Sequence, residues 1–392
     1  MSSLPRVIAL RGPSTSGFIA AVMVTFLIRT TKVMRGLRGC AEIIDVPVRK
    51  LVVGFLIAGG VGLAAADVAY SPPLGGMTIS VPAGQTRAFS MPLLHFPSGA
   101  GAVVDRVAGV GATHLDIAAA NWTPAAFSQA TNPYYLRLTS GASVGRTLMV
   151  SGTANTPSRL FVSSDGVDLN LGDGPAAGDG YELVLADTLS SLFGTSTLQA
   201  GPDANSADNV LIWANTVWVN YYYNNVNNRW QRSTDTVASP SRDNFVLRPD
   251  RGFMITRRAN STLNMYVTGR VPAAAGRPVH SRPGTSFLSL AVPTDITIGD
   301  LALHTRLAGW KTATDAASSS AADRLQVWSS TTWTIYYLNN SGNWQRNTDI
   351  ATSPSRNGVI IPAGRPIMIS RVEAGSGATT LISLPINYTL AN

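Results

Sequence analysis

The chain contains the same block of sequence twice, and this duplication limits what it can fold into more than any other feature. Each copy has two Trp residues, a Tyr pair followed by Asn, a Trp-Gln-Arg triplet, a Thr-Asp pair and a Ser-Pro-Ser-Arg segment, offset by 114 or 115 residues. A duplicated block indicates a module that folds as a unit. A residue present in both copies is therefore first a requirement of that fold and only second a candidate for chemistry. The paired positions are Trp213/Trp328, Trp218/Trp333, Tyr221/Tyr336, Tyr222/Tyr337, Asn224/Asn339, Asn225/Asn340, Trp230/Trp344, Gln231/Gln345, Arg232/Arg346, Asp235/Asp349 and Arg242/Arg356.

Composition after residue 66 favours strands over helices. This part of the chain has only two glutamates, Glu182 and Glu373, and one lysine, Lys311, so the usual helix-forming surface residues are scarce. Thr, Val, Tyr, Trp and Ser occur instead in short runs bounded by Gly, Pro, Asn and Asp, which is typical of strands joined by tight turns. We therefore predict an all-β fold, with antiparallel meanders that form β-sandwich or barrel-like modules and an internal duplication.

Each copy is predicted to contain a three-stranded meander followed by a hairpin. The predicted strands are 209–213, 217–223, 229–233, 245–247 and 253–257 in the first copy, with the hairpin strands 359–361 and 367–371 in the second. Side-chain alternation places Trp218 and Tyr222 on one face of the meander and Tyr221 on the other.

The expected organisation is an N-terminal β domain over residues 67–175, a first repeat over 176–271 and a second repeat over 284–392, with a linker over 272–283. Two segments depart from the strand pattern. Asp187 is expected to cap a short helix over 188–193, which Gly194 ends. The Ala- and Ser-rich run 313–322 is expected to be an exposed loop.

The N-terminal segment has the pattern of a secretory signal. Arg49 and Lys50 precede the uncharged run 51–63, which ends in three alanines at 64–66. This run is shorter than the roughly 20 apolar residues that a membrane-spanning helix needs. We expect a targeting region over 1–66, with a signal peptide over about 34–66 that starts at Met34 or belongs to a chain starting at Met1, and cleavage near Ala66. The alternative is an uncleaved N-terminal anchor. Cleavage would leave no stable transmembrane span and a protein that is secreted, periplasmic or on the cell surface.

Removal of this segment changes the charge of the chain. Residues 1–66 hold eight of the 30 basic and two of the 22 acidic residues, so the net charge falls from +8 to +2. The high isoelectric point therefore gives no reason to expect nucleic acid as a partner. The single cysteine, Cys40, also lies in this segment, so we expect hydrophobic burial rather than disulfides to hold the exported protein together.

Ser143 is the centre of a G-x-S-x-G pattern over residues 141–145, which resembles the nucleophile elbow of serine hydrolases. The elbow needs a strand before the serine and a helix after it. Residues 147–150 continue as a strand pattern, so the segment is predicted to be a hairpin turn between 134–138 and 147–150. In the hydrolase alternative, Ser143 is the nucleophile and His280 or His304 completes the triad.

The stretch 165–179 is the best candidate for a cofactor site, because calcium prefers several oxygen ligands on a turning loop. Its candidate ligands are Asp165, Asp168, Asn170 and Asp173. The stretch lacks the spacing of an EF-hand and its closing glutamate, and Asp-Gly pairs also form ordinary turns. The histidines have no zinc-ligand spacing.

The repeated aromatic residues allow three interpretations. Aromatic side chains at period two usually fill a core or pair across strands. Alternatively, Trp230 and Trp344 stack on sugar rings while Arg232 and Arg346 supply hydrogen bonds, or the rings form an interface with another protein.

Several short motifs together resemble an uncharacterised family of secreted bacterial β-rich proteins. The motifs are Pro133–Leu136, Asp187–Leu189, Leu192–Gly194, Ala207-Asp208, the Tyr-Tyr/Asn/Trp hairpin, Gly252–Ile255 and Arg257-Arg258. The resemblance implies an exported protein without known activity and supplies no catalytic residues. The second copy departs from the pattern, since Gly299-Asp300-Leu301 stands only loosely for Asp187-Thr188-Leu189.

The expected function is a non-catalytic structural or binding role at the cell envelope or outside the cell, with a polysaccharide or an envelope protein as partner. The alternatives are a carbohydrate-binding module that uses surface Trp and Tyr, and a secreted serine hydrolase.

Overall fold

The computed structural model describes residues 74–385, apart from 92, 95–102, 118–126, 128–130, 152–154, 164–168, 170–173, 215, 273–275, 282–283, 291–292, 308, 351 and 373–379. All of them belong to one compact unit, Ser71–Asn392. The expected signal peptide, its cleavage site and Cys40 lie outside the described residues. The predicted all-β class is confirmed, because strands arranged in antiparallel sheets and a barrel make up most of the regular structure.

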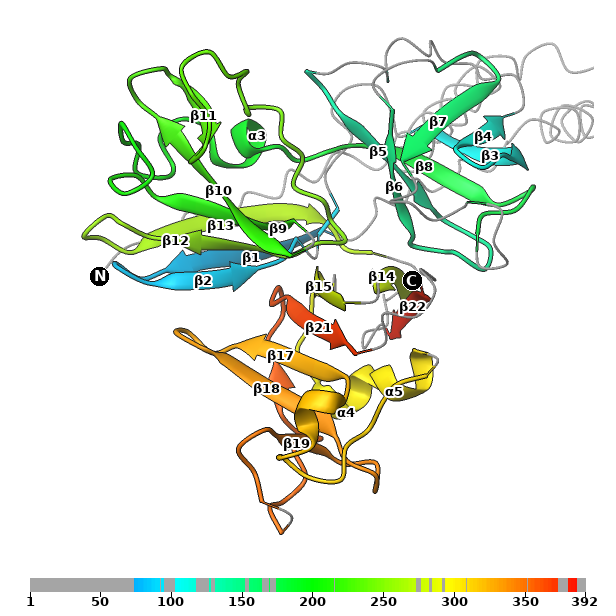
Figure 1. Cartoon of the computed structure of the whole chain (residues 1–392). Coiled ribbons are helices and arrows are strands. Elements are labelled where there is room, and N and C mark those ends of the chain that lie inside the picture. Colours follow the sequence, from blue (N-terminus) through cyan, green and yellow to red (C-terminus); the bar gives the residue numbers. More distant parts are fainter. Residues whose placement is uncertain are drawn as a thin grey trace, which may run out of the picture. The chain divides into compact units, whose positions relative to one another are not determined.

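Six strands form a closed barrel in the order β3-β4-β7-β6-β5-β8 (Figure 1). The strands are β3 (Val103–Val110), β4 (His114–Ile117), β5 (Tyr134–Leu138), β6 (Thr147–Val150), β7 (Arg159–Ser163) and β8 (Gly180–Leu185). Leu115, Leu136, Leu138, Leu160 and Tyr181 are fully buried members of its core cluster. The barrel therefore has an interior filled with apolar side chains.

The first copy of the repeat forms a five-stranded antiparallel sheet in the order β11-β10-β9-β12-β2. Its strands are β2 (Thr86–Phe89), β9 (Asn209–Ala214), β10 (Val217–Asn224), β11 (Arg229–Arg232) and β12 (Phe253–Thr256). Two further strands, β1 (Leu74–Val81) and β13 (Leu263–Arg270), pair antiparallel along their full length.

The second copy repeats this arrangement in the order β19-β18-β17-β21-β15. Its strands are β15 (Gly284–Leu288), β17 (Arg324–Trp328), β18 (Trp333–Leu338), β19 (Trp344–Arg346) and β21 (Ile367–Arg371). The pair formed by β14 (Gly276–Ser281) and β22 (Thr380–Pro385) corresponds to β1 and β13. A short pair joins β16 (Ile296–Thr297) to β20 (Ile360–Ile361).

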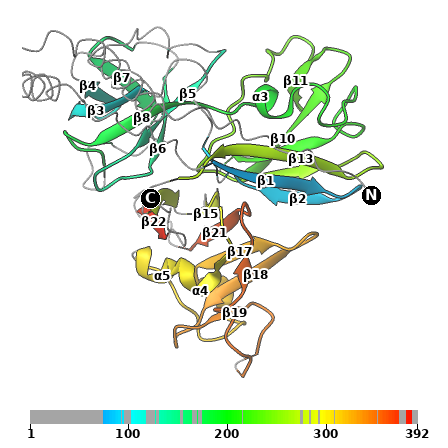
Figure 2. The ribbon, with the colours of Figure 1, turned by 180° about the vertical axis from the view of Figure 1, so that it is seen from behind.

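The sequence repeat is thus a repeat of sheet topology, and the topology extends further than the matching sequence. Strand β2 lies before the barrel in the chain but pairs with β12, as its equivalent β15 pairs with β21. Figure 1 labels the blue β2 and the later strand β12 in the same sheet region, and Figure 2 shows from behind the blue strands β1 and β2 beside β13, although the barrel separates the early strands from the later ones in sequence. The sheet of the first copy therefore takes strands from both sides of the boundary expected at residue 175. Part of the expected linker, 276–281, is strand β14.

The predicted meander matches β9, β10 and β11 to within one residue at each end. The predicted hairpin of 245–247 with 253–257 is wrong, because β12 pairs with β9 and β2 instead. Residue Val246 forms only an isolated bridge, to Thr188. The local turn was recognised from sequence, but the partners of its two arms lie far along the chain.

Each sheet has its own core, built around an equivalent indole. Trp230 is 1% exposed and packs with Phe193 and Phe253 in the first copy, and Trp344, also 1% exposed, packs with Trp310 in the second. Main-chain N–H groups of both indole residues donate to equivalent acceptors, the side-chain oxygens of Asp243 and Asn357. The interpretation of the repeated aromatics as core residues therefore holds for Trp230 and Trp344.

The opposite faces of the two sheets meet in one shared apolar cluster. Phe287 is 1% exposed and lies between Trp218 of the first copy and Trp333 of the second, with centroid distances of 5.2 and 5.7 Å and edge-to-face geometry. The indole N–H of Trp213 donates to the carbonyl of Thr285, and that of Trp328 donates to the carbonyl of Thr86. These two hydrogen bonds are equivalent, since β2 and β15 hold the same place in the two sheets. Each copy therefore donates to the other the same hydrogen bond that it receives, so the contact between the copies is approximately reciprocal.

The few helices are short. Helix α3 (Leu189–Phe193) is capped by Thr188, whose hydroxyl accepts from the Ser191 N–H, and not by Asp187 as predicted. In the second copy Thr297 caps α4 (Ile298–Leu301), and α5 (Leu303–Arg306) follows. Among the described residues, no helix is long and apolar enough to cross a membrane.

The run 313–322 is only partly the exposed loop that its composition predicts. Residues 314, 315, 317, 320 and 321 are exposed. The run also contains the 3-10 turn η2 (Ser319–Ala321), and Ala313 and Ala322 are buried in a cluster with Tyr337.

Candidate functional site

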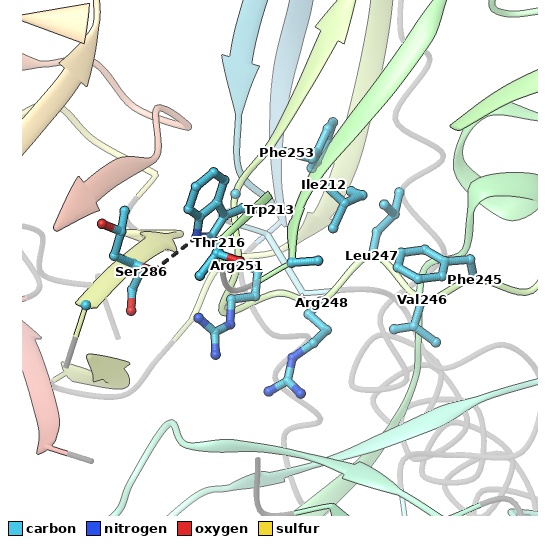
Figure 3. Close-up of a pocket in the computed structure, with 14 residues that line it drawn as sticks. Ile212, Trp213, Thr216, Phe245, Val246, Leu247, Arg248, Arg251, Phe253 and Ser286 are labelled. Atoms are coloured by element: carbon cyan, nitrogen blue, oxygen red, sulfur yellow. Dashed lines mark hydrogen bonds between the residues drawn. The ribbon is translucent and has the colours of Figure 1, made fainter. Parts of the chain in front are cut away.

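A cavity with a mixed lining lies where the first sheet meets β15 of the second copy, and has a volume of about 580 Å³ (Figure 3). Three segments line it: the end of β9 with the following turn, residues 245–253, and the start of β15. The lining residues are Ile212, Trp213, Ala214, Thr216, Phe245, Val246, Leu247, Arg248, Arg251, Gly252, Phe253, Gly284, Thr285 and Ser286. Its size falls in the range of small-molecule sites, about 300–1,000 Å³.

Apolar side chains on fixed backbone form one wall. Phe245 stacks on Tyr221 with ring centroids 4.5 Å apart. Leu247 is held by a backbone hydrogen bond to the carbonyl of Asp187, and Phe253 is buried in the first core. Trp213 is oriented by its hydrogen bond to Thr285, drawn as a dashed line in Figure 3. This wall is thus shaped before any ligand arrives.

Two arginines form the polar side of the cavity. The Pro-Asp-Arg-Gly turn brings them together, because the Arg251 N–H donates to the Arg248 carbonyl at 3.1 Å. Arg248 holds the Asp250 carboxylate with two hydrogen bonds of 2.9 and 2.8 Å. Arg251 lies farther from the same carboxylate, at 3.8 Å. Figure 3 shows both guanidinium groups extending in the same direction from the turn.

Gly252 allows the turn to lie directly against the second copy. A Cβ atom at this position would be 2.5 Å from the Cβ of Pro366 and 2.7 Å from the ring of Phe287. Only a glycine permits this approach, and the Gly252 N–H donates to the Phe287 carbonyl. The cavity is therefore tied to the contact between the two copies.

This arrangement suits a ligand with an anionic group and an apolar body. Two guanidinium groups and one carboxylate leave one positive charge at the cavity, and a guanidinium binds carboxylate or phosphate oxygens in a bidentate manner. Hydroxyl groups of Thr216, Thr285 and Ser286 add hydrogen-bonding capacity to the lining.

Ser143 lies in the turn between β5 and β6, as predicted, and not in an elbow. The two strands pair antiparallel, and the Gly145 N–H closes the turn on the Leu138 carbonyl. Ser143 is fully buried, and a strand rather than a helix follows it. The strand–turn–helix geometry that presents a catalytic serine is therefore not formed around this residue.

The candidate calcium ligands Asp165, Asp168, Asn170 and Asp173 lie outside the described residues. The neighbouring Asp179 is described, and its carboxylate accepts from the Ala176 N–H at 2.8 Å, as in an ordinary turn. Within the described part of the chain, no cluster of three or more His, Cys, Asp or Glu side chains could hold a metal ion.

The rings of Trp230 and Trp344 are both buried. A ring that stacks on a sugar has to face solvent, so this arrangement does not favour the sugar-stacking interpretation. The neighbouring arginines have structural partners. The Arg232 N–H and guanidinium donate to Asp235, and the Arg346 N–H donates to Asp349.

The acidic residues present in both copies are held by arginines. A hydrogen bond from the Arg242 guanidinium lowers the pKa of Asp235 below its ordinary value, and Arg356 lowers that of Asp349 in the same way. Asp208 and Asp323 are buried and paired with Arg257 and Arg371.

No protein-family model matches the sequence, and no curated protein is similar to it. The class that the fold defines is an all-β protein with a duplicated five-stranded sheet and a six-stranded barrel. The resemblance to a secreted β-rich family stays a prediction.

The cavity was missed by sequence reasoning, although the turn over 249–252 was recognised. The signal that could have pointed to it is a difference between the copies. The first copy has Arg248 and Asp250 where the second has Pro362 and Gly364.

Proposed function

We propose that the protein is an exported, non-catalytic structural or binding protein of the cell envelope or the extracellular space. In this proposal the two sheets form a fixed scaffold, and the cavity at Arg251 is where a ligand binds. The binding partner in the cell is an envelope polysaccharide or an envelope protein.

One observation supports this proposal above the others: the side chains that the two copies share are used inside the fold. Trp230 and Trp344 fill the cores, and Asp208 and Asp323 close equivalent buried ion pairs. Duplication has thus retained the residues that stabilise a scaffold. The copies also differ at the cavity, where Arg248 and Asp250 stand in place of Pro362 and Gly364, and a binding specificity would be set there.

The experiment is expression of the full chain in a bacterial host, followed by cell fractionation and mass spectrometry of the N-terminus. We expect the protein in the periplasm, the envelope fraction or the medium, with a new N-terminus near Asp67. A full-length protein confined to the cytoplasm would contradict the export part of the proposal.

The hydrolase alternative is tested on the same material with p-nitrophenyl esters and the variant Ser143→Ala. We expect equal and negligible turnover by both proteins. Turnover that disappears in the variant, while its circular dichroism spectrum stays unchanged, would replace the proposed function with an enzymatic one.

A further inference from the structure

Arg251 has a counterpart at the same place in the second copy, and the two arginines are used differently. Arg251 and Arg365 each lie two residues before the first residue of equivalent strands, Phe253 of β12 and Ile367 of β21. The main-chain N–H of each arginine also donates the same turn hydrogen bond, to the carbonyl of the residue three positions earlier. The positions are therefore equivalent in fold.

The guanidinium of Arg365 has its binding partners within the fold. Its guanidinium donates to the Ala88 carbonyl at 3.2 Å and lies over the ring of Phe89, 5.7 Å from the centroid. Burial lowers its pKa below the ordinary value. This arginine fastens the turn of the second copy to strand β2 of the first.

Arg251 does not have these partners. Strand register makes Leu288 the equivalent of Phe89, so no aromatic ring lies at the matching position. Among the described residues, its guanidinium forms an ion pair with Asp250 alone, at 3.8 Å, and that carboxylate already accepts two shorter hydrogen bonds from Arg248. Within the described part of the chain, Arg251 therefore keeps donor groups at the cavity lining that can bind a ligand.

We propose that this cavity binds a small organic anion, with its carboxylate, phosphate or sulfate group on Arg251 and its apolar body against Ile212, Phe245 and Leu247. The inference rests on the proposed binding function and names the chemical class of the ligand. Guanidinium donors supply the charge recognition, and the preformed apolar wall supplies the affinity for the body.

The charge balance of the site favours an anion over a cation or a neutral sugar. The lining contains two arginines and no carboxylate, and Asp250 beside it offsets one of them. A neutral sugar would accept hydrogen bonds from the Arg251 guanidinium but would leave its positive charge without a counter-charge. A cation would meet a net positive charge.

The test compares probes with the same eight-carbon chain in isothermal titration calorimetry of the exported protein. Octanoate and octyl phosphate carry an anionic head, whereas octanol and octyl glucoside, used below its micellar concentration, are neutral. We expect one site for at least one anion, bound at least tenfold more tightly than either neutral probe. The preferred anion identifies carboxylate or phosphate as the head group.

The residue assignment is tested with Arg251→Gln, which we expect to weaken anion binding at least tenfold. Arg258→Gln is the matched control, because it removes one positive charge from an exposed position of the same copy outside the cavity. Ala214→Trp fills the cavity from an exposed position and should abolish binding without loss of the fold. Thermal denaturation verifies that all three variants are folded.

Equal binding of neutral and anionic probes, no binding of any probe, or unchanged binding by Arg251→Gln and Ala214→Trp would each overturn the inference. These outcomes leave the export and scaffold parts of the proposed function intact when the protein is exported and folded. Failure of export would contradict the proposed function independently of any titration.

Discussion

Asp208 and Asp323 show at the level of single residues how the duplicated module uses charge. Asp208 is fully buried and accepts hydrogen bonds from the N–H groups of Gln199 and Arg258 while it pairs with Arg257. Asp323 repeats this role with the N–H groups of Lys311 and Val372 and with Arg371. Each carboxylate joins a loop to the end of a strand, so its charge is fully compensated by the fold.

Replacement of Asp208 by Asn is expected to reduce the free energy of unfolding by about 3–5 kcal/mol, because the buried Arg257 then lacks a counter-charge. Asp323→Asn should have an effect of similar size, since its surroundings are equivalent. Asp295→Asn is the control, as that carboxylate is exposed and accepts one backbone hydrogen bond. Urea denaturation followed by circular dichroism measures all three. A loss no larger than that of the control would contradict the structural role.

Asp235 and Asp349 make the free energy of unfolding decrease at acidic pH. Arginine hydrogen bonds hold their folded-state pKa values below the unfolded value of about 3.9. The stabilisation is therefore complete above the unfolded pKa and is lost as the pH falls from there toward the folded pKa. We expect the wild-type protein to lose stability between pH 6 and pH 3, and the double variant Asp235→Asn/Asp349→Asn to lose less. Urea midpoints at the two pH values decide this, and equal losses would show that these carboxylates do not carry the effect.

At the scale of the elements, the first helix of each copy, α3 or α4, depends on a threonine cap. The Thr188 hydroxyl accepts from the N–H of Ser191, and the Thr297 hydroxyl accepts from the N–H of Asp300. Thr188→Ala should cost about 1 kcal/mol of stability, and Thr297→Ala a similar amount. Ser190→Ala, in the first turn of the same helix but without a capping hydrogen bond from its side chain, should cost nothing or stabilise slightly. Thermal denaturation of the three variants tests this, and a similar loss in all of them would remove the caps as the cause.

Strands whose partners follow closely in the chain were predictable from sequence, and the others were not. Period-two patterns and Asn-rich turns located β9, β10 and β11, as well as β5 and β6 around Ser143. The partners of β12 are β9 and β2, and β2 lies more than 150 residues earlier in the chain. Short-range patterns carry no information about such a pairing. For the same reason, the cavity at Arg251 could not be predicted, because β15 of the other copy forms one of its sides.

At the scale of the whole chain, the two copies are joined through one aromatic cluster rather than only through a connecting segment. Phe287 packs between Trp218 and Trp333, which in turn pack on Trp213 and Trp328. The two equivalent indole hydrogen bonds cross between the copies. Burial of a Phe side chain of this kind is worth about 3–5 kcal/mol in large-to-small substitutions. The repeat-containing part of the chain should therefore unfold as one cooperative unit.

Hydrogen–deuterium exchange of the variant Phe287→Ala tests this account most directly. Phe287 belongs to β15 of the second copy, but it packs on Trp218 of the first as closely as on Trp333 of the second. We predict that amides of β9–β10 and of β17–β18 lose protection together, by the same factor. Loss of protection confined to β15, β17, β18 and β21, with the first copy unchanged, would contradict the claim that the twin sheets form one scaffold.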